Sequence, residues 1–313
     1  MDKSLRARIV TVPFWRLISL AFLLTPVAAP QSVYTLEAIA ADQFQPSIGF
    51  DEISGLQIDA HGNVAGLARK KGGRSVGFYW PTADSVKPLM LENAEGRFDC
   101  EPIGIDGSGS VHLRCEGERG AIFSAPLAAL GSTEGSLTKA TNRADTPPSN
   151  DNGLVLGKIA PSILVSPCAA LAIHDPYVTF STVTRRGANG TVTETLPLVA
   201  GDLTVTAMLA RSVAPSGDLI VGVRDGVECV QGSSVTGRRA ILWTRDAGKW
   251  TASVLDQIPI SLEVGLCAHH LRLEEANDVN DAGQITGKGT CADLDGDVRA
   301  IAYRLTPVSI RQP

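Results

Sequence analysis

The chain has 313 residues, a formal net charge of −5 and many turn-forming residues, with 31 glycines and 18 prolines. An acidic protein repels the phosphate backbone, so the charge argues against a nucleic-acid partner. The six cysteines form no CxxC pair, which argues against zinc ribbons and thioredoxin-like redox centres. We predict no cofactor.

The first 29 residues have the three parts of a secretory signal peptide. A basic start is followed by an apolar run at residues 17–24 and by the small residues Val27, Ala28 and Ala29. We therefore predict a signal peptide at 1–29 and a single secreted or periplasmic domain at 30–313, with no transmembrane segment after processing. The leader carries Lys3, Arg6, Arg8 and Arg16 against Asp2, so its removal changes the net charge from −5 to −8.

A short pattern recurs five times along the predicted domain. The copies begin at Asp59, Asp106, Asn150, Ala214 and Asn280, and each has a glycine three positions later, at Gly62, Gly109, Gly153, Gly217 and Gly283. A type I turn favours Asp or Asn at its first position, and in hairpins it is closed by a residue with positive φ, usually Gly. Each copy is therefore expected to be the corner of a β-hairpin, and none of them requires a ligand.

A further apolar strand follows each corner after a polar loop. These strands are expected at residues 76–80, 121–123, 169–173, 240–243 and 300–303. A hairpin with a third and a fourth strand makes a four-stranded antiparallel unit, and such units stack radially. The predicted fold is all-β, a β-propeller of about five four-stranded antiparallel blades, and residues 33–38 would close the ring by pairing with the last blade. An ordinary two-sheet sandwich is the alternative.

The repeat resembles that of the probable extracellular repeat proteins of the HAF family. Their pattern is A-x-x-I-N-x-x-G-x-V-x-G, then a loop and a His-Ala-Phe triplet, and residues 276–287 (ANDVNDAGQITG) are similar to its first part. The resemblance covers residues 33–307, although the triplet itself is replaced, for example by Val76-Gly77-Phe78. It implies export and repeated β structure, and it implies no catalytic residue.

Acidic residues precede four of the five corners, where the first strand of each blade would begin. In a propeller these strands line the central channel, so the acids could form a ring at its mouth. Such a ring would bind a cation or a basic group, or supply paired carboxylates for glycoside cleavage. The candidates for catalysis are Glu52, Glu101 and Glu275. Charged strand ends that face solvent are the alternative.

Asp293, Asp295 and Asp297 form a candidate calcium loop. An EF-hand has Gly at its sixth position and Glu at its twelfth, whereas here Gly296 is fourth and Arg304 is twelfth. A calcium site that also uses carbonyl ligands is one hypothesis. A polar loop without a metal is the other, because short Asp and Gly clusters are typical of loops.

The even number of cysteines favours disulfides in an exported protein. Cys100 and Cys115 are equidistant from the corner at Asp106 to Gly109, so we predict that they pair across the hairpin. The other four are Cys168, Cys229, Cys267 and Cys291. We expect these in loops at one end of the fold, where Cys267 would pair most simply with Cys229 or Cys291.

These features favour an exported repeat protein that acts as a binding or protein-interaction module. Its partner would be an unknown protein or a small extracellular ligand. The alternative is a secreted hydrolase that uses the acids at the channel mouth, and a structural repeat protein without a small ligand is a third possibility. Salt bridges that engage the acids would remove the support for the hydrolase.

Overall fold

The computed structural model describes residues 33–44, 49–71, 73, 75–82, 88–91, 100–105, 110–115, 122–126, 138–140, 154–163, 177–187, 190–199, 205–230, 233–262, 267 and 269–308. All of them belong to one compact unit, residues 32–313. The predicted signal peptide, the corners that begin at Asp106 and Asn150, the strand at 169–173 and Cys168 lie outside these ranges. Among the described residues, no helix is long and apolar enough to cross a membrane.

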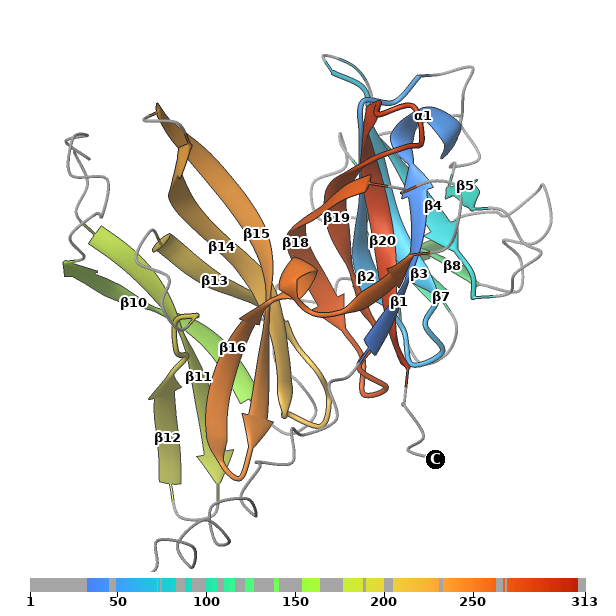
Figure 1. Cartoon of the computed structure of the whole chain (residues 1–313). Coiled ribbons are helices and arrows are strands. Elements are labelled where there is room, and N and C mark those ends of the chain that lie inside the picture. The colour runs from blue at the N-terminus through green and yellow to red at the C-terminus, as the bar shows by residue number, and fades with distance from the viewer. Residues whose placement is uncertain are drawn as a thin grey trace, which may run out of the picture. The chain divides into compact units, whose positions relative to one another are not determined.

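The prediction of an all-β fold is confirmed, and the described strands form four sheets (Figure 1). The N-terminal sheet contains β2 (Glu52–Ile58), β3 (Val64–Arg69), β4 (Ser75–Trp80) and β5 (Leu89–Leu91). The second sheet contains β6 (Cys100–Ile105), β7 (Ser110–Cys115), β8 (Ile122–Pro126) and β9 (Thr138–Ala140). In both sheets each strand pairs antiparallel with the next one along the chain.

The third sheet has seven strands and combines two such meanders. The first consists of β10 (Leu154–Ile163), β11 (Tyr177–Gly187) and β12 (Gly190–Thr195). The second consists of β13 (Val205–Val213), β14 (Leu219–Val230), β15 (Ser233–Asp246) and β16 (Lys249–Val254). One parallel pair, Thr179 with Ala207, joins β11 to β13. We call the whole third sheet, β10 to β16, the seven-stranded sheet.

The C-terminal sheet combines strands from both ends of the described chain. Its order is β17 (Ile260–Leu262), β1 (Val33–Ala40), β20 (Val298–Val308), β19 (Ile285–Ala292) and β18 (His269–Val279). β1 runs antiparallel to β20, with Val33 opposite Val308 and Ala40 opposite Ile301, and Figure 1 shows the two side by side. The N-terminal segment therefore pairs with the last strand, as the sequence suggested. The short helix α1 (Ala41–Phe44) follows β1, and the 3-10 helix η2 (Leu255–Gln257) follows β16.

Three of the predicted corners are described, and all three form the expected turn. In each, the glycine amide donates a hydrogen bond to the carbonyl of the first corner residue. The distances are 3.0 Å for Gly62 to Asp59, 2.9 Å for Gly217 to Ala214 and 3.0 Å for Gly283 to Asn280. The three glycines have φ angles of +84°, +80° and +73°, in the left-handed region that favours glycine.

A one-residue bulge interrupts the first strand of four hairpins at the same place. The extra residues are Leu56, Ile103, Arg211 and Asn277, each three positions before the first corner residue. At the turn, one residue on the side of the second strand has no cross-strand partner. At the bulge, one residue of the first strand has no cross-strand partner. In the hairpins β2–β3 and β6–β7 the two offsets cancel, so the inward and outward alternation of the two strands stays matched away from the turn. β13 and β18 contain further register shifts farther from the turn.

The glycine that ends the repeat lies opposite this bulge in three hairpins. A Cβ atom would overlap a carbonyl oxygen of the first strand at each place: Ser54 for Gly66, Leu209 for Gly222 and Glu275 for Gly287. Only glycine permits this close approach of two backbones. In the second sheet Leu113 holds the same place, so glycine is not required opposite every bulge.

Hydrophobic residues of β20 contribute to two cores. Ile301, Tyr303 and Leu305 pack in a cluster that includes residues of β14, β15 and β18, whereas Ala302 packs in the cluster that contains Phe78 and Trp80. Because alternate residues of a strand point to opposite faces, the C-terminal sheet is packed on both faces. A third cluster surrounds Trp243 of β15. Trp80 and Trp243, expected to be packing residues, are 8% and 0% exposed.

A disulfide joins Cys267 to Cys291, one of the two pairings expected for Cys267. With a sequence separation of 24 residues, it contributes about 3.5 kcal/mol on the chain-entropy estimate. Cys229 and Cys291 lie within β14 and β19, not in loops, because these hairpins are longer than predicted. The register of β6 and β7 places Cys100 directly opposite Cys115, as predicted.

The close approach at Gly287 predicts a measurable cost of adding one methyl group. Gly287→Ala should lower the free energy of unfolding by about 3 kcal/mol, because its Cβ would overlap the Glu275 carbonyl oxygen. Gly104→Ala is the matched control, since a Cβ there meets no atom within 4 Å, and it should be neutral or slightly stabilising. Urea denaturation followed by circular dichroism measures both. Equal losses in the two variants would contradict this account of the repeat glycine.

The register of the second sheet predicts a disulfide between Cys100 and Cys115. Mass spectrometry of the unreduced, proteolysed protein should recover the two residues in one cross-linked peptide, because cysteines opposite one another on neighbouring strands are within bonding range. The Cys267–Cys291 peptide serves as the internal control. Alkylation of Cys100 or Cys115 in the native, unreduced protein would refute the pairing.

Candidate functional site

The three acids expected at the channel mouth all lie opposite a basic residue of the neighbouring strand. The register pairs Glu52 with Arg69, Glu101 with Arg114, and Glu275 with Lys288. Opposite charges that face each other across an antiparallel ladder stabilise the pair by a fraction of a kcal/mol, up to about 1 kcal/mol. The register therefore places each acid opposite a residue of opposite charge, and an ion pair between such partners is observed for Glu275 with Lys288.

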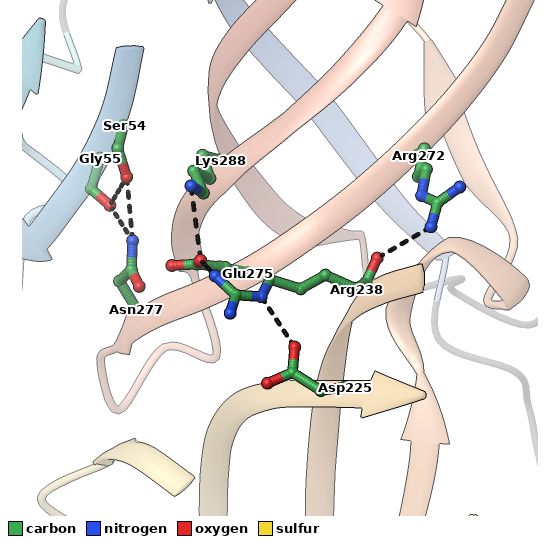
Figure 2. Close-up of polar contacts among 8 residues, drawn as sticks. All are labelled: Ser54, Gly55, Asp225, Arg238, Arg272, Glu275, Asn277 and Lys288. Atoms are coloured by element: carbon green, nitrogen blue, oxygen red, sulfur yellow. Dashed lines mark hydrogen bonds and ion pairs between the residues drawn. The ribbon is translucent and has the colours of Figure 1, made fainter. Parts of the chain in front are cut away.

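Glu275 lies at the centre of a charged cluster that joins two sheets (Figure 2). Its Oε1 accepts a hydrogen bond from Nη1 of Arg238 on β15 and lies 3.4 Å from Nζ of Lys288. Nε of Arg238 donates to Oδ1 of Asp225 on β14 at 2.8 Å. Nη2 of Arg272 lies 3.5 Å from the carbonyl oxygen of Arg238. The C-terminal sheet is thereby bonded to the seven-stranded sheet.

The electrostatics of this cluster favour a structural role for Glu275. Its side chain is 11% exposed, and one carboxylate oxygen serves two cations. The hydrogen bond to Asp225 raises the pKa of Arg238, and the bond to Glu275 adds to this effect against the opposing cost of burial. Tyr303 holds the backbone by donating from its hydroxyl to the Glu275 carbonyl oxygen at 2.8 Å. Glycoside cleavage needs two carboxylates that face each other across the substrate, whereas Glu275 faces Arg238 and Lys288.

The polar residues of the last corner bond the C-terminal sheet to the N-terminal sheet. Nδ2 of Asn277, the bulge residue of β18, donates to the Ser54 hydroxyl at 3.0 Å and to the Gly55 carbonyl at 2.8 Å (Figure 2). Nδ2 of Asn280 donates to the carbonyl of Asp59, the first residue of another corner, at 2.8 Å. The polar side chains that identify the repeat in the sequence therefore form hydrogen bonds between hairpins.

Asp278 bonds to both neighbouring sheets with a single carboxylate. Its Oδ2 accepts from the amide of Ile58 at 2.8 Å, while its Oδ1 accepts from the amide of Val279 at 3.0 Å and from the hydroxyl of Ser212. Burial raises the pKa of Asp278 from 3.8 to about 6, although the bonds from Ser212, Ile58 and Val279 oppose the rise. Ser212 and Asp278 hold equivalent positions, each directly after the bulge residue of its strand.

Arg304 forms a second junction between the C-terminal and N-terminal sheets. It is 2% exposed, and its Nη1 donates to the carbonyl of Gly62 at 2.9 Å. Its guanidinium carbon lies 4.6 Å from the centroid of the Trp80 ring, which is within the range of a cation–π interaction. Nε and Nη2 both bond to the carboxylate of Glu37 on β1, so this buried charge is compensated.

The candidate calcium loop forms another turn of the repeat type. The amide of Gly296 donates to the Asp293 carbonyl at 3.2 Å, and Oδ1 of Asp293 accepts from the amides of Asp295 and Asp297, each at 3.0 Å. Oδ2 of Asp293 lies 2.7 Å from Nη2 of Arg299. Desolvation raises the pKa of Asp293, but these bonds and the charge of Arg299 outweigh it and lower the pKa. Within the described ranges, no group of three or more His, Cys, Asp or Glu residues is arranged to hold a metal ion.

The sequence pointed to Glu275 but not to the residues that surround it. Lys288 could have been found by the same count from the corner that places Cys115 opposite Cys100. Arg238 and Ser212 belong to a different sheet, so no local pattern around the last corner indicates that they contact Glu275 and Asp278.

The charged cluster predicts different costs for two similar substitutions. Glu275→Gln should lower the free energy of unfolding by about 2 kcal/mol, because it leaves Arg238 and Lys288 without their shared anion. Glu52→Gln is the control, and because Glu52 is exposed its loss should stay below about 0.5 kcal/mol. Chemical denaturation at low salt and in 1 M NaCl measures both, and most of the effect at Glu275 should persist in high salt, because salt screens partly buried ion pairs less than exposed ones. A loss at Glu275 no larger than that at Glu52 would show that the cluster does not stabilise the fold.

Comparison with known proteins adds no assignment. No protein-family model matches the chain, and no curated protein sequence matches it. The contacts of the described residues are therefore the basis for assigning a function.

Proposed function

We propose that the chain is an exported β-propeller of about five four-stranded antiparallel blades, related to the HAF repeat proteins, that acts as a binding or protein-interaction module. Pairing of β1 with β20 supports the propeller, because a closed ring of blades brings the first and last strands of the domain together. The disulfide between Cys267 and Cys291 supports export, since such bonds persist in oxidising compartments.

Contacts of the first strands also support a ring of blades. β18 packs against β2 of the N-terminal sheet and against β13 of the seven-stranded sheet. Each of these three strands is the one that leads into a described corner, and the carboxylate of Asp278 bonds to residues of all three. First strands that meet in this way are expected around the central channel of a propeller.

The observation that carries the binding function is that Glu275 is engaged by Arg238 and Lys288, while the strand register places Glu52 and Glu101 opposite Arg69 and Arg114. Glu52, Glu101 and Glu275 each lie opposite a Lys or Arg on the next strand. The repeat therefore places each acid opposite a basic residue, and it does not place two carboxylates opposite each other as hydrolysis would require. The polar residues of the hairpin corners bond to other hairpins. Residues that recognise a partner are therefore expected in the connecting loops, where binding residues are commonly found. The partner is an extracellular or periplasmic protein, or a small ligand of the same compartment.

A pull-down with a folded and an unfolded form of the domain tests this function. Residues 30–313 would be immobilised with disulfides intact and, as the control, after reduction and alkylation, and then exposed to the secreted or envelope fraction of the source cells. We expect at least one partner that binds saturably to the oxidised form alone, with an affinity measurable by calorimetry.

Two outcomes would overturn the proposal. One is the absence of any saturable partner for the oxidised domain. The other is turnover of a glycan or ester library by the wild-type chain that is lost in a Glu275→Gln variant shown by circular dichroism to be folded, which would instead establish the secreted hydrolase.

A further inference from the structure

The carboxylate of Asp278 is the one atom group described above that bonds to residues of three sheets. Ile58 lies in the N-terminal sheet, Ser212 in the seven-stranded sheet and Val279 in the C-terminal sheet itself. The bulge at Asn277 gives Asp278 this position, and the bulge at Arg211 does the same for Ser212. Because one titratable group makes these three bonds, their strength depends on whether that group is charged.

We propose that Asp278 is a pH-sensitive latch that holds the C-terminal sheet to the N-terminal and seven-stranded sheets more firmly under mildly acidic than under neutral conditions. This inference is independent of the ligand of the proposed binding module, because it concerns only the joint between the sheets.

The geometry accommodates the protonated acid without loss of a partner. A proton taken from solvent onto Oδ1 can be donated to the Ser212 oxygen, since a hydroxyl accepts as well as donates. Oδ2 still accepts from the Ile58 amide, and the remaining lone pair of Oδ1 still accepts from the Val279 amide. Protonation therefore removes a partly buried charge and keeps all three bonds, whereas ionisation leaves the charge in a desolvated position.

No charged group on the strands packed against β18 contributes to the pKa of Asp278. The elements concerned are β2, β13, β14, β15, β19 and η2. Their charged residues within the described ranges are Glu52, Arg211, Arg224, Asp225, Glu228, Arg238, Arg239, Arg245, Asp246, Asp256 and Lys288. Burial raises the pKa of Asp278 and hydrogen bonds lower it, with no contribution from a neighbouring charge. The latch is therefore set by desolvation, not by an ion pair.

The sign of the pH dependence follows from the rise of this pKa on folding. A carboxyl whose pKa is about 6 in the folded protein, against 3.8 for the ordinary group, binds its proton more tightly when folded. Its favourable contribution is complete below pH 3.8 and is lost as the pH rises through 6. Asp293 has the opposite behaviour, because its pKa is lowered in the folded protein.

Urea denaturation at several pH values measures the contribution of Asp278 to the unfolding constant, with Asp278→Asn as the test variant. Between pH 4.5 and 7.5 the unfolding constant of the wild type should rise roughly twentyfold relative to that of Asp278→Asn, whose amide does not titrate. Asp281→Asn is the matched control, because Asp281 is exposed and uses one oxygen to accept from the Ser216 amide. Its unfolding constant should follow the wild type across the range. A ratio of wild type to Asp278→Asn that stays constant within about twofold would overturn the proposal.

Two measurements on the wild-type protein keep the proposal testable if Asp278→Asn does not fold. The carboxyl carbon resonance of Asp278 should titrate near pH 6, and a midpoint below about 4.5 would refute the latch. Hydrogen exchange of the Ile58 and Val279 amides, corrected for the intrinsic rate, should slow as the pH falls from 7.5 to 5. Protection that does not change with pH would equally refute it.

Discussion

One extra residue in the first strand of a hairpin is the constraint on which most of the described structure depends. The turn displaces the register by one residue and the bulge returns it, so in β2 and β3 the same faces of both strands stay buried along their length. The bulge also brings the two backbones so close that Gly66 and Gly287 cannot carry a side chain. It turns the following residue toward the neighbouring sheets, which is how Ser212 and Asp278 come to meet.

The C-terminal sheet is held to its neighbours by apolar contacts, which supply stability, and by polar bonds, which fix the alignment of the sheets. Burial of Tyr303 and Leu305 on one face and of Ala302 on the other is apolar and non-directional, and it supplies most of the free energy. The polar bonds of Arg304 and Asp278 contribute less, because each replaces a bond to water. Their fixed donors and acceptors instead select one alignment of the sheets, since a displaced alignment would leave buried polar groups without partners.

The elements that depend on local chemistry could be predicted from the sequence. The turns at Asp59, Ala214 and Asn280 follow from residue preferences within four positions, and the pairing of Cys100 with Cys115 follows from counting away from the corner. That count is correct because the offsets of turn and bulge cancel. Contacts between sheets could not be predicted in this way, since Arg238 reaches Glu275 only through the packing of strands that are distant in sequence. The repeat in the sequence therefore identified the corner residues that make contacts between sheets, but it did not identify the residues that they contact.

The pairing of β1 with β20 has a consequence for the order in which the molecule is completed. During synthesis β1 emerges before every other described strand and its partner β20 after all of them, so the edge of β1 that pairs with β20 stays unpaired until β20 is made. An exposed edge strand is prone to pair with other chains during such a delay. The hairpins between them close over short loops and can form while the wait lasts. We therefore expect the hairpins to form first and the pairing of β20 with β1 to form last, because that pairing joins strands far apart in sequence.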